Sequence, residues 1–139
     1  MPISIEELQG LHEQVSVLIS DFSSQQDYKS RLALVRASKV YMSKYLKLSC
    51  ALLTWIHDQS ASTDKLKVIF RRSIQDLNSD AKKIVGLYLQ YGHGCDNADR
   101  FKFQMAFSEA ITLLELRLKL EKEHIFPEYQ LLSRQNQPV

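Results

Sequence analysis

Apolar residues recur every three or four positions along most of the chain, the spacing that places them on one face of an α-helix. The first such stretch follows Ser4, which forms a capping-box pattern with the glutamate three residues later. The apolar spacing breaks at the polar run that begins at Ser23. This pattern predicts a first helix over about 4–23.

Three further stretches keep the same periodicity. One runs from about Tyr28 to His57 without a glycine or proline to stop it, and the next ends at Gly92, since a glycine commonly follows the last turn of a helix. The final stretch reaches Pro127, which ends or kinks a helix because proline lacks the amide hydrogen. We therefore predict helices over about 27–57, 63–91 and 97–126, followed by a short tail.

Four long helices joined by short turns are typical of an antiparallel, up-and-down four-helix bundle. The four glycines and three prolines are few for 139 residues, which also favours a few long helices over many short strands. A chain of this length can bury a substantial core as one unit. The prediction is an all-α fold with a single domain over 1–139.

The net charge of +2 hides an uneven distribution along the chain. The segment 27–83 carries twelve Lys and Arg residues against five Asp and Glu, whereas the flanking segments carry six against eleven. A basic middle could attract an acidic protein surface or a nucleic-acid backbone. It could equally be the solvated face of two helices, and both interpretations stay open.

Three features bear on location. Cys50 and Cys95 are far apart and belong to no cluster, which favours reduced thiols. The first ten residues contain no basic leader with an apolar core, and no run approaches eighteen apolar residues. We expect a cytoplasmic protein without a membrane-bound segment.

The last long stretch places three polar side chains beside a stripe of leucines. Arg117, Glu121 and His124 are spaced by four and three residues, so they share one helix face. Burial there is costly unless these groups are paired. Either an Arg117–Glu121 pair locks the helix into the bundle as a structural polar row, or the row has a functional use.

The end of this stretch resembles the last helix of hemerythrin-like metal-binding bundles, which often has acidic residues before Phe-Pro, here Phe126-Pro127. His12 stands about where that family has an early ligand. The family has a histidine four residues before a glutamate, whereas this chain has Arg117 before Glu121, and a guanidinium repels a metal ion. Only His12 and Glu121 remain as metal-ligand candidates, so we expect no metal and no cofactor.

A second resemblance covers about residues 40–126. The run 114–121, LELRLKLE, matches the pattern Leu-Glu-x-Arg-x-x-Leu-Glu in the last helix of the bacterial regulators of sigma D, the Rsd/AlgQ family of anti-sigma factors. The segments 100–103 and 108–110 look similar to that family in their spacing, and Cys50 stands where a family helix has a cysteine.

This resemblance implies binding, without catalytic residues, to the DNA-binding region of the primary sigma factor, which the family keeps from RNA polymerase. Because that region is basic, we expect the acidic first and last helices to form the contact, rather than a nucleic-acid site. The alternatives are a hemerythrin-like metal-binding or sensing bundle with a degenerate site, and an adaptor whose basic central helices hold an acidic partner. The candidate partner contacts are Glu109, Glu115, Arg117, Glu121 and Glu123.

Overall fold

The computed structural model describes residues 4–59 and 64–135, and the side chains of 4–59 and 75–134. Within these ranges the chain is helical and contains no strand, so the prediction of an all-α fold is confirmed. The predicted helix ranges agree with the observed ones to within a few residues, except at the end of the last helix. The elements are α1 (Ile5–Ser24), α2 (Tyr28–Gln59), α3 (Asp64–Tyr91), the short η1 (Asn97–Asp99), α4 (Arg100–Leu120), the π turn η2 (Glu121–Ile125) and α5 (Phe126–Gln135).

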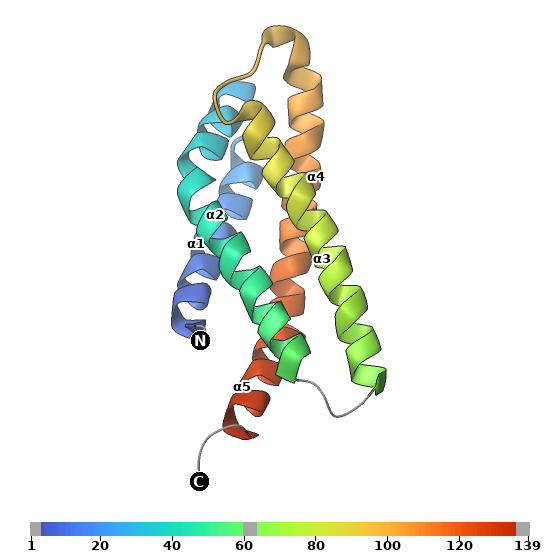
Figure 1. Cartoon of the computed structure of the whole chain (residues 1–139). Helices are drawn as coiled ribbons and strands as arrows, with labels where there is room; N and C mark the ends of the chain where they lie inside the picture. The colour runs from blue at the N-terminus through green and yellow to red at the C-terminus, as the bar shows by residue number, and fades with distance from the viewer. Residues whose placement is uncertain (1–3, 60–63, 136–139) are drawn as a thin grey trace.

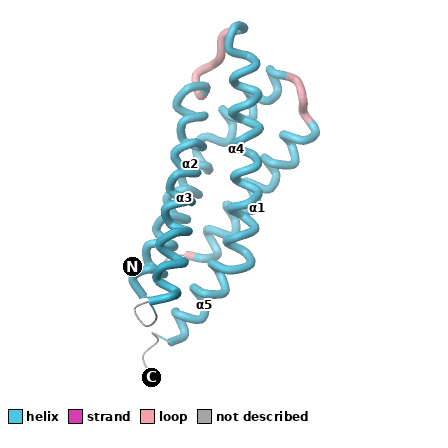
Figure 2. The backbone as a smooth tube through the Cα atoms, turned by 90° about the vertical axis from the view of Figure 1, so that its right-hand side faces the viewer, coloured by secondary structure: helices cyan, strands magenta, loops and turns pink. Residues whose placement is uncertain are grey.

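The long helices run alternately up and down, as Figures 1 and 2 show. Each packs against its sequence neighbours, and α1 also packs against α4, which closes the bundle. The α1–α2 turn and the α3–α4 loop lie at one end (Figure 1), while α5 lies at the other. There α5 contacts the end of α2, where the ring centroids of Trp55 and Tyr129 are 5.0 Å apart.

Local hydrogen bonds set the start of the first two helices. The Glu7 amide donates to Ser4 Oγ at 3.1 Å, which confirms the predicted cap at Ser4. The Ser30 amide donates to the Asp27 carboxylate at 3.0 Å in the same way. The hydrogen bonds from Ser30 hold the pKa of Asp27 below its ordinary value. Both helices therefore begin at an oxygen that satisfies a first-turn amide.

The α3–α4 loop is fastened to α2. A Cβ at Gly92 would collide with the carbonyl oxygen of Tyr88, and Gly94 has a φ of 134°, so glycine is needed at both positions. The Tyr28 hydroxyl donates to the carbonyl of Cys95, and Arg36 Nη2 donates to the carbonyl of His93 at 3.2 Å. These contacts fix the end of the bundle at which α1 turns into α2.

The last helix does not stop at Pro127. It continues to Gln135 through the π turn, in which the Phe126 amide donates to the carbonyl of Glu121, five residues back. Proline has no amide hydrogen, and its ring clashes with the carbonyl four residues earlier in a regular helix. The wider turn just before Pro127 accommodates this residue within the helix, so the predicted short tail is helical.

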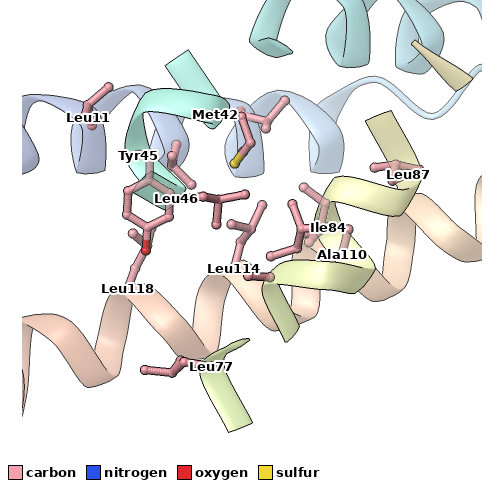
Figure 3. Close-up of a cluster of buried hydrophobic side chains, with 14 of the residues drawn as sticks. Leu11, Met42, Tyr45, Leu46, Leu77, Ile84, Leu87, Ala110, Leu114 and Leu118 are labelled. Carbon is pink, nitrogen blue, oxygen red and sulfur yellow. The ribbon is translucent and has the colours of Figure 1, made fainter. Parts of the chain in front are cut away.

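The core runs the length of the bundle and takes apolar side chains from every long helix. Figure 3 shows Met42, Ile84 and Leu114, from α2, α3 and α4, in the interior of the bundle, and Leu11 contributes to the same core from α1. Met42, Ile84 and Leu114 follow the apolar spacing that predicts their helices, so their burial follows from helical periodicity. Among the described residues, no helix is long and apolar enough to cross a membrane.

Candidate functional site

Arg117 lies in the middle of the bundle with only 1% of its side chain exposed. A buried cation is costly unless its donors are satisfied. Its Nε and Nη2 donate to Ser49 Oγ at 3.2 and 2.7 Å, and Nη1 donates to the main-chain carbonyl of Leu77 at 2.9 Å. The guanidinium thus ties α4 to α2 and α3 through neutral acceptors.

Glu121 is fully buried one helical turn further along. Its Oε1 accepts a hydrogen bond from the Tyr45 hydroxyl and lies 3.3 Å from Nε2 of His12, which is itself 3% exposed. Within the described residues, Glu121 Oε2 and both ring nitrogens of His12 have no hydrogen-bond partner. This end of the cluster therefore joins α1, α2 and η2 with fewer hydrogen bonds than the Arg117 end.

Tyr45 connects the two ends. Figure 3 shows its ring pointing from α2 toward the last helix, beside Leu118. The Arg117 Cζ lies 5.8 Å from the ring centroid, while the hydroxyl donates to Glu121. Burial, and then the negative charge of Glu121, raise the pKa of Tyr45 well above its ordinary value. We call His12, Tyr45, Ser49, Arg117 and Glu121 the central polar cluster.

The predicted Arg117–Glu121 pair is not formed. Among the described side chains the two make no ion pair, and each has its own partners. The reason is that Ser49 and the Leu77 carbonyl meet the guanidinium from neighbouring helices, while Tyr45 takes the carboxylate. The sequence left open whether this row is buried; the structure shows Arg117 and Glu121 buried, each with its own partners, and no ion pair between these two described side chains.

His124 is the second correction, because 68% of its side chain is exposed and it lies 4.0 Å from the Glu123 carboxylate. A regular helix would have kept it on the face of Arg117. The π turn rotates the residues after Glu121, and Ile125 and Phe126 take the buried side instead. The buried row therefore ends at Glu121.

Two members of the cluster were missed as site residues. Ser49 and Tyr45 lie four residues apart on the face of α2 that its apolar residues share, so the spacing alone marks them as core positions. The signal that could have identified them is a hydroxyl at a core position, because a buried hydroxyl needs a hydrogen-bond partner in the interior. The carbonyl of Leu77 had no such signal, because every residue carries one.

The predicted partner contacts do not form one surface. Arg117 and Glu121 are enclosed in the core, so their assignment as partner contacts is wrong. Glu109 lies toward α3, where its Oε1 is 3.2 Å from Lys83 Nζ. Glu115 and Glu123 line a groove of about 380 Å³ between α1 and the last helix. Only these last two acidic candidates share a face.

The two metal-ligand candidates, His12 and Glu121, do come together. In the part of the chain that the structure describes, however, no three His, Cys, Asp or Glu residues cluster as a metal site requires. The same centre also holds the Arg117 guanidinium, a cation that a metal ion would have to approach. The donor set does not fit a di-metal centre.

Fold and centre together define an all-α, antiparallel four-helix bundle whose middle is closed by a hydrogen-bonded arginine. Comparisons with protein-family models, with curated proteins and with solved structures gave no match. The resemblances to the regulators of sigma D and to hemerythrin-like bundles therefore remain predictions.

Proposed function

We propose that this chain is a non-enzymatic binding module that holds the basic DNA-binding region of the primary sigma factor on its α1–α4 face. The observation that carries the proposal is that charged residues of the run 114–121 face both the core and the solvent. Arg117 and Glu121 point inward and serve the fold, whereas Glu115 is exposed on the outside of the same helix. The run thus supplies a rigid support and an exposed carboxylate, Glu115, which shares the groove with Lys119.

The α1–α4 groove, in which Glu115 and Glu123 lie beside Lys119 and Lys122, continues along α1. We call it the acidic groove because Glu13 in its continuation brings the carboxylates to three against two lysines. Past Ser16 and Lys122, which line both parts, it opens into a second hollow of about 540 Å³ that adds Glu13 and Val17. Val17 is 59% exposed and offers an apolar anchor beside the carboxylates. Such a surface suits a helix that combines basic and apolar residues.

The central polar cluster supports this function by fixing how the helices that form the groove pack together. Buried polar groups with specific partners favour one packing arrangement over others, because a shifted register leaves them unsatisfied. Arg117 couples the last helix to Ser49 on α2 and to Leu77 on α3. The acidic groove is therefore held in shape before a partner binds, which lowers the entropy lost on binding.

A titration calorimetry experiment tests the proposal with the purified chain and the DNA-binding region of the primary sigma factor. We expect stoichiometric binding, and we expect the double variant Glu115→Lys/Glu123→Lys to bind at least about tenfold more weakly. Glu109→Lys is the matched control, since it reverses an equally exposed carboxylate on the α3 side. Absence of binding by the unmodified chain would refute the sigma-factor proposal.

The second candidate is the hemerythrin-like bundle with a degenerate site. The observation that favours it is the 3.3 Å approach of His12 Nε2 to Glu121 Oε1. Metal analysis of the same preparation separates the two candidates. Stoichiometric metal without sigma binding would favour this second function. We expect the purified chain to contain no metal, and to retain none after it is incubated with metal ions.

A further inference from the structure

A separate groove lies between α2 and α3, on the basic part of the chain. Its volume is about 320 Å³, and all the residues that line it are within the described ranges. The floor consists of Met42, Leu46 and Tyr88, which are 1%, 7% and 8% exposed. We call it the basic groove because Lys39 and Lys47 lie on its rim.

The floor offers a partner almost no hydrogen bonds. The only polar atom of its three side chains, the Tyr88 hydroxyl, lies 2.6 Å from Ser38 Oγ, inside the bundle. Burial raises the pKa of Tyr88, as expected for a phenol held in an apolar setting. Because its hydroxyl is paired with Ser38, Tyr88 contributes only its ring to the groove, and the floor therefore favours apolar groups.

Two apolar side chains form the α3 lip of this groove. Val85 is 42% exposed, and Leu89, one helical turn later, is 77% exposed. Exposing a leucine to this degree brings no benefit to the isolated fold, because burial of apolar surface is what stabilises it. Together with the floor, these residues make a continuous apolar strip between α2 and α3.

The rim on α2 is basic. Lys39 and Lys47 stand two helical turns apart on the same side of α2, about 12 Å along the axis at 1.5 Å per residue. Among the described residues, no carboxylate lines the basic groove. The neighbouring α1–α2 groove differs, since Glu7 and Asp21 face Lys44 there. The basic groove thus favours a negative partner, whereas the α1–α2 groove has carboxylates of its own.

We propose that the basic groove docks an amphipathic helix of a partner protein whose apolar face is flanked by Asp and Glu. Apolar side chains spaced by three or four residues would fill the strip between Met42 and Leu89, and the acidic flank would meet Lys39 and Lys47. The length of the groove fits about two helical turns. This surface is separate from the acidic groove, and its charge would repel the basic sigma region.

The apolar strip distinguishes this partner from a nucleic acid. Sequence-tolerant binding of single strands relies on exposed aromatic rings for base stacking, whereas the exposed groups of the strip, Val85 and Leu89, are aliphatic. Two lysines also provide few phosphate contacts. A protein helix, by contrast, can place apolar side chains on the strip and acidic side chains against the lysines of the rim.

The test uses fluorescence anisotropy with three synthetic helical peptides that share one leucine pattern and carry Glu, Gln or Lys at the flanking positions. We expect the Glu peptide to bind best, the Gln peptide about tenfold more weakly, and the Lys peptide not at all. Added salt should weaken the Glu peptide and leave the Gln peptide nearly unchanged. Equal binding of all three peptides, or none by the Glu peptide, would overturn the proposal.

Variants locate the binding. Leu89→Glu should abolish binding of the Glu peptide, and Lys39→Glu/Lys47→Glu should reverse the order so that the Lys peptide binds best. Because Leu89 is 77% exposed, its replacement leaves the fold intact, which a thermal melt checks. The matched controls Val40→Glu and Lys44→Glu lie on the α1 side of the same helix and should change nothing.

Other occupants of the basic groove give distinct results. Self-association of the unmodified chain that Leu89→Glu abolishes would mean that a second copy covers the strip, and it would overturn the proposal. Direct binding of anionic vesicles or single-stranded DNA, without binding of the Glu peptide, would also overturn it. The variants Glu115→Lys/Glu123→Lys should keep the peptide site, so failure of the sigma-factor proposal is observed independently.

Discussion

Arg117 and Glu121 lie one turn apart and are equally buried, yet their surroundings differ. The guanidinium donates three hydrogen bonds to Ser49 and Leu77. The carboxylate uses one oxygen, toward Tyr45 and His12, and leaves Oε2 without a hydrogen bond among the described residues. The difference shows that one half of the central polar cluster locks helices together, while the other half retains unused hydrogen-bonding capacity.

The largest expected effect comes from removing the lock. Arg117→Ala should reduce the free energy of unfolding by about 3–5 kcal/mol, because it leaves Ser49 and Leu77 without their donor and Glu121 without a nearby cation. Urea denaturation measures this loss. Arg117→Lys is the control, since one ammonium keeps the charge but cannot bridge both acceptors. A melting temperature of Arg117→Ala equal to that of the unmodified chain would contradict the buried lock.

The next pair of variants compares the two halves directly. Ser49→Ala and Tyr45→Phe each remove one hydroxyl from a charged partner, and each should cost about 1–3 kcal/mol. We expect Ser49→Ala to cost more, because Arg117 loses the acceptor of two hydrogen bonds, whereas Glu121 keeps His12 beside it. Denaturation under identical conditions measures the difference. The reverse order would show that the Glu121 half carries more of the stability.

A smaller effect is expected in alkaline solution. The pKa of Tyr45 is raised in the folded state by burial and by Glu121, so the unfolded chain loses its proton first. The stability associated with neutral Tyr45 is complete below about pH 10 and declines as the pH rises toward the folded pKa, by at most about 1.4 kcal/mol per pH unit. Tyr45→Phe should flatten this decline, which stability measurements between neutral and alkaline pH would reveal. An unchanged slope would place the titration elsewhere, for example at Tyr88.

The smallest effect is expected at the surface. Glu109 and Lys83 are 3.2 Å apart but both 57% exposed, so solvent screens the pair. Glu109→Gln should change the free energy of unfolding by less than about 1 kcal/mol. Chemical denaturation at low and high salt measures it. A loss as large as that of Ser49→Ala would mean that this exposed pair couples α3 and α4 more strongly than the buried cluster does.

The helices could be predicted well because their signals are local. Ser4 marks the first cap, and the apolar phase of each stretch places residues such as Leu8, Met42, Ile84 and Leu114 in the core. The sequence also placed Arg117 and Glu121 on one helix face beside a leucine stripe, but it left open whether they are buried, and the structure shows that both are. Each of these inferences needs only the geometry of a single helix.

The partners inside the bundle depended on the tertiary structure. Which acceptor Arg117 meets depends on how far α2 and α3 slide past α4, and a main-chain carbonyl such as that of Leu77 carries no sequence signal. The π turn before Pro127 changes the helical phase, which is why His124 is exposed although its spacing places it on the helix face of Arg117 and Glu121. The distribution of carboxylates and lysines between the acidic and basic grooves was decided in the same way, by which helices became neighbours. Local periodicity therefore determined the elements and their buried faces, and inter-helix register decided the contacts.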